Sequence, residues 1–142
     1  YPIVDASMRE MNATGFMHNR GRLVVSSFLI KILRINWKFG EIYFAKKLID
    51  YDRCQNFGNW LWSFGQLDSG GYIRIFNPWR QSEKYDKECE YIKKWIPELG
   101  NVNNNDIHKW NIMHKNYPNL KYPKPIVDYD KERDKTMDIF KH

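Results

Sequence analysis

The sequence of 142 residues contains little cysteine and no long apolar run. Without a stretch of about 18 apolar residues, no membrane span is expected. Cys54 and Cys89 lie far apart, which excludes a CxxC metal pair and a disulfide-dense framework. The four histidines lack the spacing of metal ligands, and no glycine-rich phosphate loop or Ser/His/Asp set is present. We therefore expect a protein without metal, in a reducing compartment.

The beginning of the sequence has no cationic segment followed by an apolar stretch, so nothing in it indicates secretion. We expect an intracellular protein, in the cytoplasm or the nucleus. The sequence starts at Tyr1, inside a helical pattern and without an initiator Met. This start is typical of a piece of a longer protein.

Aromatic residues and positive charge are abundant instead. Aromatic side chains make up 16% of the sequence, with six Trp and nine Tyr, and the net charge is +6. Such a composition is compatible with nucleic acid, an acidic partner or an anionic cofactor, and selects none of the three. The length is that of one domain or part of one.

Helical periodicity dominates, and alternating strand patterns are nearly absent, which predicts an all-α protein. Apolar positions cover most of the helix surface between Arg22 and Leu33, which indicates a buried central helix. Further helices are expected over 5–12, capped by Asp5 and ended by Gly15, over 41–49, and over 91–99 until Gly100.

The glycines of residues 50–73 predict a loop with a short helix near 56–62. Asn77-Pro78 is typical of an N-cap and first helical turn. The prolines of 122–127 favour an extended tail, after which Asp128 is expected to cap a final charged helix. No internal repeat or domain boundary is visible, so 1–142 is expected to be one all-α unit.

A short polar stretch holds Asp50, Asp52 and Asn56. Two carboxylates spaced by one residue in a loop can converge on a ribose or an amide edge, because ionised carboxylates accept hydroxyl and N–H donors. An asparagine both donates and accepts, so it can face either redox form of a ring. The alternative interpretation is a pair of solvated loop carboxylates and a helix-capping amide.

Three tryptophans lie near this stretch: Trp37, Trp60 and Trp62. On a helix, positions 60 and 62 point about 200° apart. One indole can therefore face the interior and the other a cavity, which suits one electron-relay indole and one stacking indole. The alternative is that all three are ordinary core residues.

Asn19, Arg20 and Arg22 come just before the expected buried helix, whose N-terminal amides favour anions. The two arginines lie on roughly opposite sides, so one can meet a phosphate outside and the other an anionic group inside; two solvated arginines are the alternative.

A second basic region surrounds the next expected helix and can contact phosphates, although interleaved acidic residues equally favour a solvated face. It comprises Arg74, Arg80, Lys84, Lys87, Lys93 and Lys94.

Taken together, these motifs resemble the C-terminal half of the FAD-binding domain of photolyases and cryptochromes. The resemblance covers Tyr1 to Lys141 and rests on PIVDASMREMNATGFMHNRGR, SSFLIKILRINW with GEIYF, LIDYDRCQNFGNWLW, and YIRIFNPWRQSEKYD with YIKKWIPEL. It implies an all-α domain that binds FAD in a folded conformation. In this family the light-excited reduced flavin passes an electron to a pyrimidine dimer flipped out of DNA, and photolyases are themselves a standard example of base flipping.

The resemblance also implies residue roles. The FAD contacts would be Asn19, Arg22, Asp50, Tyr51, Asp52 and Asn56, with Asn56 beside the flavin N5. The electron relay that photoreduces the flavin would run through Trp60 and Trp37. The contacts with UV-damaged DNA would be Asn19, Arg20, Trp62, Arg74 and Gln81, with Trp62 packing against the flipped lesion.

Subclass features point to more than one branch of the family. Asn19-Arg20 and Asn56 resemble repair enzymes for cyclobutane dimers, and Trp62 resembles class I photolyases, whereas other parts of the same motifs resemble DASH-type cryptochromes. The family's antenna domain and the first half of its FAD-binding domain have no counterpart here. We therefore expect a partial photolyase chain that requires a separate or preceding N-terminal half; the alternatives are a cryptochrome-type photoreceptor and a non-catalytic remnant.

Overall fold

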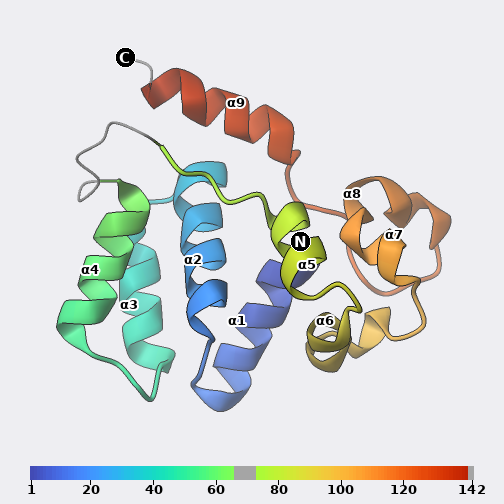
Figure 1. The fold of residues 1–142 in the computed structure, drawn as a ribbon, viewed down its shortest axis with the longest axis horizontal. Coiled ribbons are helices and arrows are strands. Elements are labelled where there is room, and N and C mark those ends of the chain that lie inside the picture. Colours follow the sequence, from blue (N-terminus) through green and yellow to red (C-terminus); the bar gives the residue numbers. More distant parts are fainter. Residues whose placement is uncertain (66–72, 141–142) are drawn as a thin grey trace.

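The computed structural model describes residues 1–65 and 73–140, and in them every regular element is helical, as predicted (Figure 1). The elements are α1 (Pro2–Thr14), α2 (Asn19–Ser27), a π-helical turn η1 (Phe28–Ile32), α3 (Trp37–Lys47), α4 (Arg53–Phe64), α5 (Pro78–Tyr85), α6 (Glu90–Trp95), a 3₁₀ turn η2 (Pro97–Leu99), α7 (Asn104–His108), α8 (Trp110–Met113), a 3₁₀ turn η3 (His114–Asn116) and α9 (Tyr129–Phe140).

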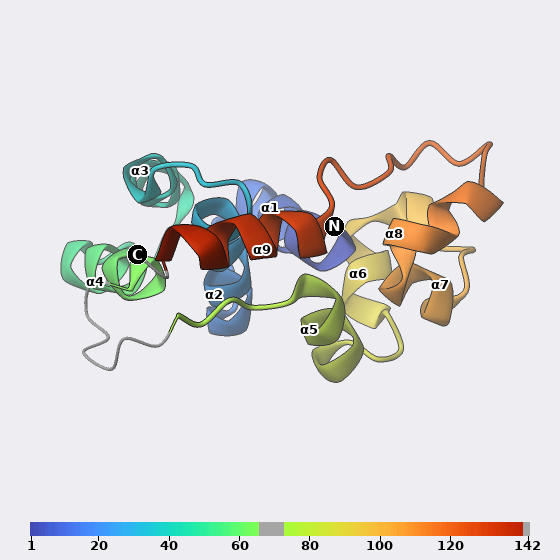
Figure 2. The ribbon, with the colours of Figure 1, turned by 90° about the horizontal axis from the view of Figure 1, so that it is seen from above.

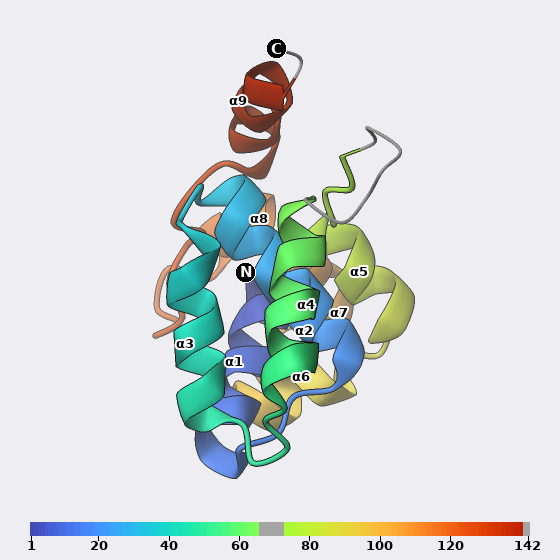
Figure 3. The same ribbon diagram turned by 90° about the vertical axis from the view of Figure 1, so that its left-hand side faces the viewer.

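The helices form two groups on either side of α1 and α2. Helices α3 and α4 stand side by side at one end, with α2 and α1 behind them (Figure 3). Helices α5 to α8 gather at the other end, where α6 packs against α1 (Figure 1). Helix α9 crosses above both, packed on η1 (Figure 2).

Helix boundaries follow local capping rules at several places. Gly15 ends α1 in a left-handed conformation, φ 74°, and its N–H donates to the Met11 carbonyl at 2.8 Å. Asn77 Oδ1 accepts from the N–H of Trp79 at 3.0 Å at the start of α5. Asp128 Oδ1 accepts from the N–H of Asp130 at 3.1 Å at the start of α9. These three predictions are confirmed.

The expected cap at Asp5 is wrong. Helix α1 begins at Pro2, because proline at the first turn loses no intrahelical hydrogen bond. Asp5 lies inside the helix, where its carboxylate accepts from Arg9 Nε at 3.3 Å. Its charge therefore positions a side chain instead of starting a helix.

The expected helix over 22–33 is buried as predicted but is not uniform. It begins earlier, at Asn19, because His18 Nδ1 caps it by accepting the Arg20 N–H at 3.1 Å. It ends as the π turn η1, in which the Leu33 N–H donates to the Phe28 carbonyl at 3.0 Å. A π turn holds one more residue per hydrogen-bonded ring than an α turn. Lys31 thereby becomes buried, and its Nζ donates to the Arg74 carbonyl at 2.6 Å.

The short helix expected near 56–62 is present and is longer than predicted. Asp52 Oδ1 accepts the Gln55 N–H at 2.8 Å and starts α4, which runs to Phe64. Asn56 lies one turn inside α4, so its alternative interpretation as a helix cap is wrong. The expected loop residues 66–72 lie outside the described part of the chain.

Other boundaries shift for identifiable reasons. Helix α3 covers Trp37–Lys47 and not 41–49, because Asn36 Oδ1 caps it through the Lys38 N–H at 3.0 Å. The helix expected over 91–99 breaks after Trp95, because Ile96 precedes a proline. The expected tail over 122–127 contains no helix or strand.

Each of the two groups of helices is held together by an apolar cluster. One centres on Trp110 and joins α1 to α6, α7 and the tail. The other centres on Trp60 and joins α1 and α2 to α3 and α4. In the second cluster, Gly40 on α3 allows close packing, because a Cβ there would lie 2.1 Å from Trp60 Cη2. The absence of a side chain at residue 40 therefore allows the Trp60 indole to pack directly against α3.

Candidate functional site

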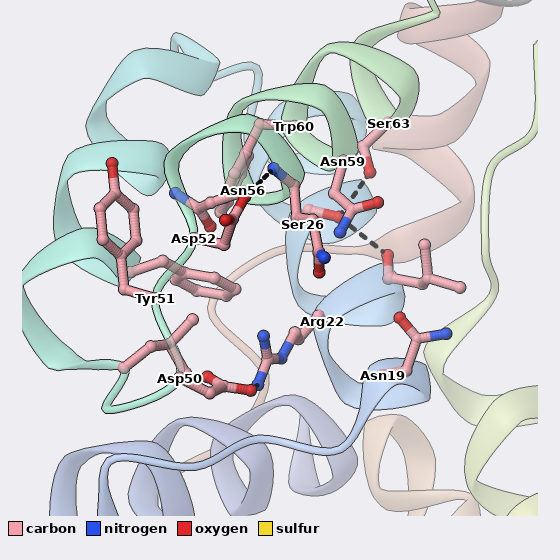
Figure 4. Close-up of a pocket in the computed structure, with 14 residues that line it drawn as sticks. Asn19, Arg22, Ser26, Asp50, Tyr51, Asp52, Asn56, Asn59, Trp60 and Ser63 are labelled. Atoms are coloured by element: carbon pink, nitrogen blue, oxygen red, sulfur yellow. Dashed lines mark hydrogen bonds and ion pairs between the residues drawn. The ribbon is translucent and has the colours of Figure 1, made fainter.

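A polar pocket lies between α2, the segment before α4, and α4 itself (Figure 4). Its enclosed volume is about 30 Å³, close to the space of one water molecule. The polar residues that line it are Asn19, Arg22, Ser26, Asp50, Asp52, Gln55, Asn56, Asn59 and Ser63. All six residues that the sequence predicted as cofactor contacts line this one pocket, together with Trp60.

Arg22 is held firmly at the edge of the pocket. Its Nη2 forms an ion pair with Asp50 Oδ2 at 2.7 Å, and its Nε donates to the Met17 carbonyl at 2.7 Å (Figure 4). The guanidinium is planar with five donors, so two fixed contacts set the direction of the others. The pair therefore offers both a cationic and an anionic group to a ligand at the same edge.

Asn56 lies at the inner wall and is buried. Its Nδ2 donates to both the carbonyl and the Oε1 of Glu41, each at 3.2 Å. Among the described residues, no donor reaches Asn56 Oδ1. The amide carbonyl is therefore free to accept from a ligand N–H, and Glu41 sets its orientation.

Glu41 is a site residue that the sequence did not reveal. It lies on α3, whereas Asn56 lies on α4, and no spacing rule connects them. Ser26 and Ser63 were also missed; their hydroxyls share a hydrogen bond of 2.7 Å at the back of the pocket (Figure 4). This bond ties α2 to α4 and keeps the two walls at a fixed separation.

The three indoles near the pocket, Trp60 and Trp62 on α4 and Trp37 on α3, have different surroundings. Trp60 is only 2% exposed, lines the polar pocket and meets Phe44 edge-on at 4.9 Å between ring centroids. Trp37 packs at the rim of the same apolar cluster and meets Phe57 edge-on at 5.1 Å. Trp62 faces a separate small cavity. Trp60 and Trp37 therefore belong to one apolar cluster, and Trp62 lies apart from it.

The five residues predicted to contact DNA do not converge on one cavity. Asn19 lines the polar pocket, Trp62 and Arg74 share the small second cavity, and Arg20 and Gln81 line a third cavity of about 450 Å³ between α1, α2 and α5. Gln81 Oε1 is buried there without a hydrogen-bond partner among the described residues. Helix α2 contributes to all three cavities, so these residues surround it.

A buried polar cluster elsewhere is structural. Ser82 Oγ and His108 Nδ1 lie 2.7 Å apart, and His108 Nε2 lies 2.9 Å from the Lys87 carbonyl and 3.4 Å from Cys89 Sγ. Burial raises the pKa of the Cys89 thiol to about 12, so it stays protonated and is a poor nucleophile. The cluster ties α5 to α7.

Over residues 1–65 and 73–140, no group of three or more His, Cys, Asp or Glu side chains is arranged to hold a metal ion. No described helix combines the length and the apolarity that a membrane crossing requires.

Known proteins match both the helical fold and the sequence of this chain. The family model for the FAD binding domain of DNA photolyase matches residues 1–142, so the chain belongs to this family. Deoxyribodipyrimidine photo-lyase of Escherichia coli is 47% identical over 139 residues, covering 96% of this chain and 29% of its own length. The enzyme of that name from Buchnera aphidicola (strain APS) is 48% identical, with coverages of 99% and 30%. The family predicted from the sequence is confirmed.

Solved structures are similar as well. An archaeal photolyase from Sulfolobus tokodaii, solved with two FAD molecules, superposes with a TM-score of 0.89 at 40% identity, covering 99% of this chain and 32% of that one. A cryptochrome from Synechocystis gives a TM-score of 0.91 at 41% identity, covering 98% of this chain and 30% of that one. The chain thus spans about 30% of the length of the curated relatives it matches.

Proposed function

We propose that the pocket between α2 and α4 is one wall of an FAD site. The observation that carries this proposal is the convergence of a fixed Arg22–Asp50 pair, the Asp52 carboxylate and the free Asn56 carbonyl beside the Trp60 indole. FAD offers matching groups: an N–H and carbonyl edge on its ring, and ribose hydroxyls. The residues present therefore fit the cofactor that the family name specifies.

The pocket alone is too small for a flavin. An enclosed volume of about 30 Å³ holds about one water molecule, far below the 300–1,000 Å³ typical of ligand sites. The ring would therefore rest against this wall, and the opposite wall would come from a further part of the protein. This agrees with the chain spanning about 30% of its relatives. The partner of this wall is thus an N-terminal photolyase half, in the same or a separate polypeptide.

The activity we propose is the light-driven repair of cyclobutane pyrimidine dimers in UV-damaged DNA, as in a deoxyribodipyrimidine photo-lyase. When bound and reduced, FAD supplies the light-excited electron that splits the dimer. Arg22 and Asp50 orient the cofactor, and Asn56 Oδ1 accepts a ring N–H. Trp60 and Trp37 carry electrons inward during photoreduction, since both belong to the aromatic cluster beside the pocket.

In this proposal DNA is held around α2. Arg20, Gln81 and Arg74 line cavities on the sides of α2 away from the flavin wall, and Asn19 borders the wall itself. Trp62 offers a partly exposed indole for stacking on an extruded base. The protein would act inside the cell, where its DNA substrate is found.

A second candidate function is blue-light sensing of the cryptochrome type. It is favoured by the TM-score of 0.91 with the Synechocystis cryptochrome, because the fold alone does not separate the two activities. Light-dependent loss of dimers from irradiated DNA distinguishes them: repair is expected, and a flavin-loaded protein that leaves every dimer intact would be assigned to sensing.

The cofactor proposal is tested by the absorption spectrum of the purified protein after incubation with excess FAD, together with its N-terminal half. A flavin spectrum that persists after gel filtration is expected. A colourless protein without tight FAD association would refute the proposal and indicate a non-catalytic remnant.

The relay is tested by Trp60→Phe. We expect light-driven flavin reduction to be blocked, because phenylalanine is much harder to oxidise than indole, while repair proceeds once the flavin is reduced chemically. Transient absorption measures the first, and dimer loss in the presence of dithionite measures the second. Equal photoreduction in the variant and the wild type would remove Trp60 from the relay.

A further inference from the structure

Two cations from different helices share one aromatic ring. The Arg20 guanidinium carbon of α2 lies 4.5 Å from the centroid of the Tyr85 ring, and Lys84 Nζ of α5 lies 5.3 Å from the same centroid. Both distances are within the range of cation–π attraction. The ring, at the end of α5, therefore holds one cation from α2 and one from α5.

Neither cation is neutralised within the described chain. Arg9, Arg22 and Arg34 each form an ion pair with a carboxylate. Across residues 1–65 and 73–140, no such ion pair involves Arg20 or Lys84. An aromatic face attracts a cation without cancelling its charge, so both groups keep their full attraction for an external anion.

The geometry leaves the donors accessible. A guanidinium that packs on a ring keeps its N–H groups in its own plane, directed outwards. Arg20 is partly exposed and Tyr85 is 49% exposed, so this surface is open to solvent. Arg20 also stands at the first turn of α2, where the backbone amides add a favourable potential for anions.

The position of Arg20 relative to the flavin wall indicates that the anion is a DNA phosphate. Asn19 lines the polar pocket, and the next residue, Arg20, lines the third cavity together with Tyr85. A nucleic-acid strand that places a lesion at the pocket would therefore run its backbone past Arg20. Phosphodiester oxygens can accept donors from two cations at once.

We infer that Tyr85 is a positioning residue for a DNA phosphate: its ring holds the Arg20 and Lys84 cations that contact the phosphate. The inference rests on the proposed function, since it takes DNA as the ligand. A phosphate contact reads no sequence, so Tyr85 contributes equally to binding of undamaged and damaged duplex. Without the ring, both charges remain in the protein, but the Arg20 and Lys84 side chains are no longer held by it.

The experiment measures dissociation constants for an undamaged duplex in the dark, between about 50 and 200 mM salt. Tyr85→Leu should weaken binding about fivefold with an unchanged salt slope, because the ring's attraction is lost but no charge is. Tyr85→Phe keeps the aromatic face and should bind within about twofold of wild type. Arg20→Gln removes a charge and should lower the salt slope by about one.

Two controls isolate the positioning role. In an Arg20→Gln, Lys84→Gln background, Tyr85→Leu should cause no further loss, because no cation is left to position. Tyr43→Leu is the matched control: Tyr43 is a comparably exposed tyrosine on α3 with Lys47 Nζ at 5.8 Å, and it lines none of the three cavities. This variant should bind as wild type does.

The outcomes separate this inference from the proposed function. Tyr85→Leu binding as tightly as wild type, an equal loss in the uncharged background, or no duplex binding by wild type at 50 mM salt overturns the positioning role. Dimer repair is measured separately on the same proteins. Tyr85-dependent duplex binding without repair supports the positioning role and overturns only the proposed activity.

Discussion

Trp110 and Trp60 are buried to almost the same extent, 1% and 2% exposed, yet their surroundings differ. The Trp110 Nε1–H donates to the Pro123 carbonyl at 2.9 Å, and the rings of Tyr117 and Tyr122 lie 5.7 and 5.8 Å away. Trp60 packs against Phe44 on one side and borders a polar pocket on the other. One indole completes a closed core, whereas the other forms the wall of an open site.

The same contrast extends to the surfaces of the two groups of helices. Around α3 and the start of α4, large apolar side chains are exposed, among them Phe39, Ile42, Ile49 and Phe57. Around Trp110, tyrosines and histidines bond within the chain, as in Tyr117 OH to Asp106 Oδ2 at 2.6 Å. The comparison teaches that the Trp110 indole is stabilised by contacts within the chain, whereas the Trp60 group combines a polar pocket with exposed apolar side chains, as the proposed flavin wall requires.

The largest expected effect is on the closed core. Trp110→Ala should lower the free energy of unfolding by about 3–5 kcal/mol, because it leaves a large cavity and an unpaired Pro123 carbonyl. Ile112→Ala, on the same helix but 63% exposed, should change it by less than about 0.5 kcal/mol. Urea denaturation measures both. Similar losses of unfolding free energy in the two variants would show that the buried contacts of Trp110 do not stabilise this core.

The next effect concerns the packing of the pocket wall. Gly40→Ala should cost about 1–3 kcal/mol and displace Trp60, because the new methyl group would lie 2.1 Å from Trp60 Cη2. Gly58→Ala is the matched control, since no atom lies within 4 Å of a Cβ there and helix α4 should gain about 0.5–1 kcal/mol. Thermal unfolding and Trp fluorescence measure both. Unchanged fluorescence in Gly40→Ala would contradict the close packing.

A smaller effect is expected at the inner wall. Asn56→Asp replaces a donor to Glu41 by a second carboxylate, so the unfolding free energy should fall by about 1–3 kcal/mol at neutral pH. Stable full reduction of bound flavin should also be hindered, because negative charge would lie beside the ring. Asn59→Asp, an exposed change in the same pocket, should leave stability within about 0.5 kcal/mol. Unchanged photoreduction kinetics in Asn56→Asp would count against this role.

The smallest effect concerns the link between α1 and the turn after α6. Arg9 pairs with both oxygens of Glu98, at 2.9 and 3.0 Å, and these hydrogen bonds hold the pKa of Glu98 below its usual value. The stabilisation is therefore complete above the unfolded pKa of about 4.3 and is lost as pH falls through the lower folded pKa. Both side chains are about one-third exposed, so Glu98→Gln should cost below about 1 kcal/mol at pH 7.

Acid titration of unfolding checks this effect. The wild type and Glu98→Gln should differ at pH 7 and converge at the lowest pH at which both remain folded. A difference that persists below the folded pKa of Glu98 would show that the pair acts through packing and not through charge.

The sequence predicted those features whose cause is local. Gly15, Asn77 and Asp128 mark helix ends because capping involves residues two to four positions apart. Asp52 was not recognised as a cap, because the glycines after it favoured a loop. Helices α7 and α8 were not predicted, because helices of five and four residues are too short to show a helical periodicity.

Contacts between residues on different helices could not be predicted from the sequence. The family resemblance supplied the cofactor contacts, but no spacing shows that Asn19, Arg22 and Asn56 line one pocket. Glu41 could not be identified, because its contact with Asn56 depends on how α3 packs against α4. The ring of Tyr85 likewise receives cations from two helices, one of them far away in the sequence.

The π turn at Phe28–Ile32 has a consequence for insertions and deletions. Deleting one residue there would let the backbone return to regular α geometry with one residue fewer in the turn, and the side chains of the turn would change direction. Lys31 would then leave the Arg74 carbonyl. A single-codon loss in this segment would therefore disturb the packing beside the polar pocket without changing any residue that lines the pocket.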